Sequence, residues 1–190
     1  VALLSRLPPA EVACGLPNFE DEQKRVLAAS YADLRLFNLY VPNGQSVGAD
    51  KFEYKLRWLT ALRDHLREEL GRHGKIALLG DFNIAPEDRD VHDPAEWRDQ
   101  VLCSVPERER LQALFDLGFV DVFRCFEQPQ QAFSWWDYRA AAFRRNRGLR
   151  IDLILASPAL AATSTGSGID TGPRGREQPS DHTPVWASFS

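Results

Sequence analysis

The sequence contains no methionine and only three cysteines among its 190 residues. Cys14, Cys103 and Cys125 form no C-x-x-C pair of the metal-binding type, so the simplest expectation is three free thiols in a reducing cytoplasm. No apolar run approaches the ~20 residues that a membrane-spanning helix needs. No secretory signal is visible either. We therefore expect a cytoplasmic protein that has no membrane partner.

An excess of positive charge is absent as well. The formal net charge of −4 argues against indiscriminate binding of nucleic acid, so any such surface must be local. Lysine is scarce, since the 23 basic residues include only Lys24, Lys51, Lys55 and Lys75. Arginine suits bidentate phosphate contacts, although an arginine-rich coding bias gives the same composition.

One segment concentrates arginine and aromatic residues. The arginines of residues 139–150 are Arg139, Arg144, Arg145, Arg147 and Arg150. A charge run of this kind is usually a solvated face. Here, however, aromatic rings precede and interrupt it: Phe133, Trp135, Trp136, Tyr138 and Phe143. Rings and guanidinium groups together favour a surface that stacks on bases and holds phosphates.

The composition predicts one globular domain that spans residues 1–190. With 44% hydrophobic residues and no internal repeat, the chain is long enough to bury a substantial core. Apolar runs between turn signals predict strands near residues 1–5, 26–31, 35–41, 75–80, 119–123, 150–156 and 184–189. The glycine- and serine-rich residues 158–179 are interpreted as a flexible connection.

Two helices are predicted among these strands. The longer covers residues 51–70, with Asp50 as N-cap, Glu53 as its capping-box partner and Gly71 at the C′ position. Its apolar residues recur at helical spacing and are interpreted as core. The shorter helix covers residues 106–117 and follows a capping box formed by Ser104 and Glu107.

Acidic and amide residues stand at the predicted strand ends. Asp81 and Asn83 follow one apolar run, so their side chains can point into the same mouth. Asp152 interrupts another strand, where a carboxylate is expensive to bury without a partner. His182, beside Asp181, is the candidate partner. This set suits metal-assisted attack of water on a phosphate.

Each part of this set also has an ordinary explanation. Asp81 and Asn83 favour turns. Asp152 can be an acid at a strand edge, and residues 180–182 can be a polar loop before an edge strand. The three features together, in this order and at strand ends, favour a catalytic site.

Several short segments carry a family resemblance. Gly-Asp-Phe-Asn at 80–83, Arg-Ile-Asp-Leu-Ile-Leu-Ala-Ser at 150–157 and Ser-Asp-His-Thr-Pro-Val at 180–185 resemble the endonuclease/exonuclease/phosphatase superfamily. Three further segments resemble its bacterial exonuclease III (AP endonuclease) branch. They are Tyr-Val-Pro-Asn-Gly at 40–44, Phe-Ser-Trp-Trp-Asp-Tyr-Arg at 133–139 and Asn-Arg-Gly-Leu-Arg at 146–150. The resemblance extends over residues 1–189.

The family begins with a segment that has no match here. That segment contains a strand with an Asn, a helix, and a second strand that ends in a metal-binding Glu. Residues 1–5 resemble a strand that follows it. We therefore expect an N-terminally incomplete domain.

The resemblance implies a fold and an activity. The fold is a four-layer α/β sandwich of two packed mixed β-sheets flanked by helices, with the N-terminal part of one sheet absent. The activity is Mg²⁺- or Mn²⁺-dependent hydrolysis of phosphodiester bonds at abasic sites and from 3′ ends of duplex DNA. The complete protein is expected to be a monomer.

The resemblance also implies roles for five catalytic residues. Asp81 orients or deprotonates the attacking water, or protonates the leaving oxygen, and Asn83 helps to hold that residue and the water. Asp152 fixes the tautomer of His182, which contacts the scissile phosphate. Tyr40 contacts the phosphate through its hydroxyl group.

The implied metal ligands are Asp181, Asp81 and Asn83. Trp135 and Arg139 face the DNA near the sugar that lacks a base. Asn146 and Arg147 complete the implied substrate-binding residues.

Two other functions remain open at this point. A phosphatase or lipid phosphodiesterase of the same superfamily uses the same acids, although the Trp-Asp-Tyr-Arg segment and the arginines argue against it. The chain can also be an inactive fragment that binds DNA weakly, because the matching Glu is absent.

Overall fold

A computed structural model describes all residues, 1–190, as an α/β fold with two sheets. The larger sheet has the order β1-β2-β3-β4-β6-β5 and the smaller pairs β7 with β8. The strands are β1 (Glu11–Cys14), β2 (Val26–Tyr31), β3 (Leu34–Tyr40), β4 (Lys75–Asp81), β5 (Val120–Asp121), β6 (Asp152–Ala156), β7 (Ser164–Ile169) and β8 (Val185–Phe189). The helices are α1 (Asp50–Leu70), α2 (Val105–Phe115) and the short α3 (Pro158–Ala161).

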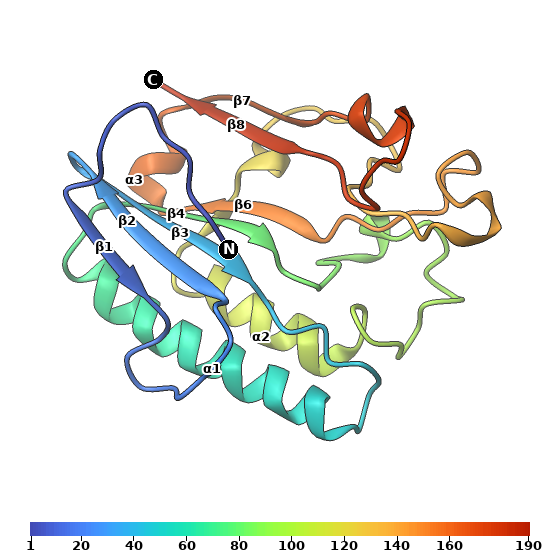
Figure 1. Ribbon diagram of the computed structural model, residues 1–190, viewed down its shortest axis with the longest axis horizontal. Coiled ribbons are helices and arrows are strands. Elements are labelled where there is room, and N and C mark those ends of the chain that lie inside the picture. Colours follow the sequence, from blue (N-terminus) through green and yellow to red (C-terminus); the bar gives the residue numbers. More distant parts are fainter.

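These elements form layers on the two faces of the larger sheet. Helices α1 and α2 cover one face, and the β7-β8 pair lies over the other (Figure 1). The larger sheet is mixed, because β3 and β4 are parallel while its other neighbouring strands are antiparallel. No helix of the protein is both long and apolar enough to cross a membrane.

The main core lies between the helices and the larger sheet. The apolar stripe of α1, which includes Trp58, Leu62 and Leu66, packs against alternate residues of the strands such as Phe37 and Leu78. All five side chains are at most 1% exposed. Burial of one such side chain stabilises the fold by about 1.5–3 kcal/mol. The packing of α1 against the sheet therefore holds the strands, and with them the strand ends, in fixed positions.

A smaller apolar cluster on the opposite face joins the two sheets. Ala77 and Ala156 of the larger sheet pack near Ala187 and Phe189 of β8. The sheet is thus apolar on both faces, as expected for a central layer.

The predicted fold class is confirmed, as are both helices and the strands at residues 26–31 and 75–80. The predicted strand at residues 1–5 is wrong: that segment has no sheet partner, and Leu4 is 94% exposed. The edge strand is β1 instead. The predicted flexible connection at residues 158–179 is also wrong, because it contains α3 and β7.

Two of the predicted helix caps also differ. The N-cap of α1 is Ala49, which makes no side-chain capping bond, and Asp50 is the first helical residue. Gly71 has a φ of −73° and so does not use the left-handed conformation available to glycine. The capping box of Ser104 and Glu107 is present at α2.

Candidate active site

The ends of three neighbouring central strands, β3, β4 and β6, lie side by side at one end of the larger sheet. Asp81 ends β4 and lies opposite Asp152, the first residue of β6, in their antiparallel register. Tyr40 ends β3 and pairs with Asp81 in the parallel register. Three residues that are distant in the sequence are therefore brought together by strand pairing alone.

His182 completes this group from the segment that precedes β8. Its Nδ1 atom lies 2.9 Å and 3.1 Å from the two carboxylate oxygens of Asp152. Its Nε2 atom lies 3.9 Å from Oδ2 of Asp81. The predicted contact between His182 and Asp152 is thus present. Because Nδ1–H donates to Asp152, the ring presents Nε2 to the mouth of the site.

Asn83 holds the Asp81 carboxylate in place. Its backbone N–H donates to Oδ1 of Asp81 at 2.8 Å, and its Nδ2 donates to Oδ2 at 2.9 Å. The same Nδ2 donates to the Val41 carbonyl oxygen at 3.0 Å. Both oxygens of Asp81 therefore have fixed donors, and Asn83 holds Asp81 in the way that the family resemblance implies.

Ser134 and Trp135 hold the positions of Asp152 and Asp181. The hydroxyl of Ser134, which is fully buried, accepts hydrogen bonds from the backbone N–H groups of Ile151 and Asp152 at 3.1 Å and 3.0 Å. The indole Nε1–H of Trp135 donates to Oδ2 of Asp181 at 3.0 Å. Adjacent residues of one segment thus hold the backbone at Asp152 and the side chain of Asp181.

The proton affinities of Asp81 and His182 are both raised. Burial, followed by the charge of Asp152, raises the pKa of Asp81 to about 7, against the opposing effect of His182. Burial alone lowers the pKa of His182, but its hydrogen bond to Asp152 and the nearby carboxylate charges outweigh this and raise it to about 9. A carboxyl group with a pKa near neutrality can both give and take a proton, as general acid–base catalysis requires.

The donor atoms at this end of the sheet suit a hard cation. Asp81 and Asp152 each offer a carboxylate oxygen, and these two atoms and a ring nitrogen of His182 lie within 4.8 Å of one another. The charge of Asp152 contributes to the raised pKa of Asp81, so a positive ion there relieves repulsion between the two carboxylates. Asp181 is not part of this compact group, and the side-chain oxygen of Asn83 already accepts a hydrogen bond from Asn43 at 3.0 Å.

Tyr40 lies beside a cleft of about 850 Å³. The side chain is 46% exposed, and the guanidinium group of Arg25 lies 5.1 Å from its ring centroid. Asn43 and Lys51 are among the other residues that line the cleft. The hydroxyl group of Tyr40 is therefore accessible to a ligand that enters the site from this side.

All four predicted substrate-binding residues have partners within the protein, and that of Trp135 is Asp181. Arg139 is 88% exposed at its side chain and pairs with Asp137 at 2.6 Å. Hydrogen bonds from Arg139 lower the pKa of the Asp137 carboxyl group to about 2. Arg147 pairs with Glu96 and its Nε–H donates to His92 at 3.2 Å.

The side chain of Asn146 bridges two parts of one loop. Its Oδ1 accepts from the Trp136 indole N–H at 3.2 Å, and its Nδ2 donates to the Gln131 carbonyl oxygen at 3.1 Å. Its contacts therefore support the conformation of this segment.

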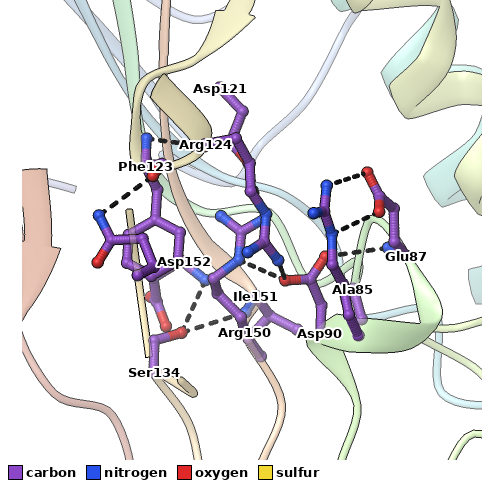
Figure 2. A network of polar contacts seen from close by, with 12 residues as sticks. Ala85, Glu87, Asp90, Asp121, Phe123, Arg124, Ser134, Arg150, Ile151 and Asp152 are labelled. Carbon is purple, nitrogen blue, oxygen red and sulfur yellow. Dashed lines mark hydrogen bonds and ion pairs between the residues drawn. The ribbon is translucent and has the colours of Figure 1, made fainter. Parts of the chain in front are cut away.

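The arginine segment forms a smaller surface than the sequence predicts. Arg150 is 1% exposed and lies between Asp90 and Asp121, at 2.6 Å and 2.7 Å (Figure 2). Phe133 and Trp136 are buried in a small core of their own. The prediction that these three residues belong to an exposed stacking surface was wrong, because a guanidinium group with two carboxylate partners can be buried.

Sequence analysis missed other residues that shape the site. Asn43 falls within the Tyr-Val-Pro-Asn-Gly segment, which was a usable signal. Ser134 lies within the Phe-Ser-Trp-Trp-Asp-Tyr-Arg segment, but nothing in the sequence indicates that its hydroxyl faces Asp152. Lys55 gives no signal, because a lysine in an amphipathic helix is ordinarily solvated.

Comparisons with known proteins identify the family. The family model described as "Endonuclease/Exonuclease/phosphatase family" matches residues 1–182. Exodeoxyribonuclease III of Haemophilus influenzae is 38% identical, over 100% of this chain and 76% of its own length.

Solved structures are similar as well. A 3′ phosphatase from Neisseria, solved with a product DNA hairpin, has a TM-score of 0.95 and 45% identity, over 98% of this chain and 73% of that one. An AP endonuclease from Archaeoglobus fulgidus has a TM-score of 0.89 and 35% identity, over 96% and 71% of the two chains.

Proposed function

The chain belongs to the endonuclease/exonuclease/phosphatase family, and on that premise we propose that it hydrolyses phosphate esters of duplex DNA at abasic sites and at 3′ ends. Its general function is that of a DNA repair nuclease. The proposal about specific bonds is supported by the names of its relatives, which include an exodeoxyribonuclease III, a 3′ phosphatase and an AP endonuclease.

The observation that carries the proposal is the contact chain Asp81···His182–Asp152. The Nε2 atom of His182 lies 3.9 Å from Asp81, while Nδ1 is held by Asp152. With a pKa of about 9, the ring is protonated at neutral pH and carries a positive charge into the mouth. A phosphate whose negative charge grows during attack is stabilised by such a fixed donor.

Asp81 is placed to handle the proton of the reaction. Its pKa of about 7 allows it to take a proton from the attacking water or to give one to the leaving oxygen. Asn83 donates to both carboxylate oxygens, so the orientation of the Asp81 carboxylate is fixed. In the proposed reaction, the hydroxyl group of the half-exposed Tyr40 donates to a phosphate oxygen.

We propose Mg²⁺ or Mn²⁺ as the cofactor, with Asp81 and Asp152 as its nearest carboxylates and Asp181 beside them. The bound ion supplies Lewis-acid polarisation of the phosphate and neutralises developing charge.

The test is cleavage of a duplex oligonucleotide with a single abasic site, with and without Mg²⁺, alongside release of phosphate from a 3′-phosphorylated duplex. Metal-dependent nicking or phosphate release is expected, with a loss of at least ~100-fold in His182→Ala, which removes one preorganised donor. A chain that binds duplex DNA without cleaving either substrate would instead be a binding fragment, and the proposal would fail.

A further inference from the structure

Lys55, in the middle of α1, has a completely buried side chain that the sequence pattern does not explain. Its Nζ atom donates to the carbonyl oxygens of Asn43 and Asn83 at 3.1 Å and 2.7 Å, and it pairs with the Glu107 carboxylate. An ammonium group has three N–H donors. Each N–H group of Lys55 therefore has its own acceptor. The Nζ atom thus fixes the relative positions of the Asn43 carbonyl, the Asn83 carbonyl and the Glu107 carboxylate.

Glu107 anchors this ammonium group to α2. Its carboxylate accepts from the backbone N–H of Leu102 at 3.0 Å and from the Ser104 backbone N–H at 3.2 Å. The side chain is fully buried. Burial lowers the pKa of Lys55, and the charge of Glu107 opposes that shift. The ion pair is thus a rigid link between two helices, with no exposure to solvent.

The two carbonyl groups belong to the loops that follow β3 and β4. Asn83 has a φ of +49°, a conformation that costs energy for a residue with a side chain and persists only where its surroundings hold it. The side chain of Asn43 donates to that of Asn83 at 3.0 Å. Asn83 in turn gives two hydrogen bonds to Asp81. One residue therefore separates the ammonium group from the Asp81 carboxylate.

We propose that Lys55 is a positioning residue: its ammonium group fixes the loops of Asn43 and Asn83, and through Asn83 it sets the place of the Asp81 carboxylate. The effect on turnover rests on the proposed function, in which Asp81 handles the proton. The effect on the order of the loops does not, so the two can be tested separately.

The chain offers a matched control for a merely structural role. Arg35 of β3 and Glu69 of α1 form another buried ion pair, at 3.2 Å, with both residues 3% exposed. This pair also joins α1 to the sheet, but it contacts neither Asn43 nor Asn83. Lys55→Met removes the cation that pairs with the buried Glu107. Arg35→Met removes the Arg35 partner of the buried Glu69, which keeps Arg72 at 3.4 Å and His73 at 3.8 Å. Both variants are expected to lower stability.

The first measurement is amide hydrogen exchange by NMR in the full chain without metal. The Asn83 N–H donates to Asp81 Oδ1, so its protection indicates the order of this loop. Lys55→Met should speed its exchange at least ~10-fold relative to the amides of β2, through local opening. Arg35→Met should not. Equal acceleration in both variants, or none in Lys55→Met, would overturn the proposal.

The second measurement is turnover on the abasic duplex at a temperature where both variants are folded. Lys55→Met should lower kcat at least ~10-fold with KM changed less than ~2-fold, because misplacement of a reacting group affects the transition state. Arg35→Met should retain kcat. If the unmodified chain cleaves nothing, the proposed function fails while the exchange result still decides the role of Lys55.

If Lys55→Met does not fold, Glu107→Gln takes its place, since it keeps the lysine and the shape of its acceptor. It should speed the exchange of the Asn83 amide in the same selective way. Unchanged protection in a folded Glu107→Gln protein would show that the ion pair does not hold this loop.

Discussion

Asp81 and Asp152 lie directly opposite each other on β4 and β6, although 70 residues of sequence separate them. Cross-strand neighbours have their Cβ atoms about 4.5–5.5 Å apart, and like charges at this distance repel. The pair persists because Asn83 donates to one carboxylate and His182 to the other. Removal of either donor should therefore disturb both carboxylates.

Replacement of Asp152 by Asn should change the tautomer of His182 while the ring stays in its position. An amide can donate to Nδ1 and so favours the proton on Nε2, and it removes the charge that raises the pKa of His182. We expect kcat to fall at least ~100-fold. The histidine titration, followed by NMR, should move to lower pH. The exposed Asp33→Asn variant serves as control and should change neither quantity.

The stability of the metal-free protein should fall as the pH rises from about 4 to about 9. The pKa values of Asp81, about 7, and His182, about 9, exceed their ordinary values of 3.8 and 6.5. The folded state therefore binds these protons more tightly than the unfolded state. The contribution of Asp81 is complete below pH 3.8 and is lost as the pH rises to about 7, and that of His182 is complete below pH 6.5 and is lost as the pH rises to about 9.

Urea unfolding in the presence of a chelator measures this effect. The Asp81→Asn variant should be less sensitive to pH below about 7, and His182→Ala should be less sensitive at higher pH. A stability that rises across this range in the unmodified protein would contradict the assigned directions of the two pKa shifts.

Arg144 and Arg145 should bind phosphates of the DNA backbone. Both are exposed and neither forms an ion pair, in contrast to Arg147 and Arg150. Changing both to Ala should weaken duplex binding. It should also reduce the slope of log affinity against log salt by about 1 for each phosphate that an arginine no longer neutralises.

The control for this pair of arginines lies on α1. Changing Arg63 and Arg67 to Ala removes the same charge near Asp64, on the helical layer that lies away from the strand ends. Its salt slope should equal that of the unmodified chain. If the two double variants give the same slope of log affinity against log salt, Arg144 and Arg145 are exposed to solvent without binding DNA phosphates.

Gly80 should tolerate no side chain. Its φ is +133°, and a Cβ atom there would lie 2.0 Å from the Leu39 carbonyl oxygen. Gly80→Ala should therefore destabilise the fold by about 3 kcal/mol or more, through strain and disrupted backbone pairing. Gly74→Ala is the control, since nothing lies within 4 Å of its Cβ position. Thermal unfolding of both variants tests the difference.

The three thiols should differ in reactivity. Cys14 and Cys125 are exposed, whereas Cys103 is buried. Burial raises the pKa of Cys103 to about 12, so it has almost no thiolate at pH 8. A thiol reagent should modify Cys14 and Cys125 in the native protein, and Cys103 only after denaturation. Rapid modification of all three under native conditions would mean that the segment before α2 opens readily.

The predicted pairing of His182 with Asp152 shows how far sequence reasoning extends toward the site. A carboxylate inside an apolar strand needs a partner, and few residues near the next strand qualify. The physical cost of burial thus makes His182 a candidate partner of Asp152, the family resemblance adds the role of the pair, and the structure shows the contact. The same argument could not find Ser134, because a serine carries no such cost in a sequence pattern.

Local chemistry determined the helices and most central strands. The spacing of apolar residues predicts α1, and the Ser104–Glu107 capping box predicts the start of α2, because both depend on neighbours within a few turns. The Gly80–Asn83 motif similarly marks the end of β4. These features depend only on residues that are close in the sequence, so they can be predicted from the sequence alone.

Only the tertiary structure decided that β7 is a strand. Its Ser- and Gly-rich sequence has weak strand propensity, but the indole ring of Trp186 lies over Gly168, where an added Cβ would come within 3.0 Å. Pairing with β8 therefore requires the small residues that suggested flexibility. Tertiary structure also decided that Arg150 and Lys55 are buried, because charges enter a core only where distant carboxylates and carbonyl groups converge on them.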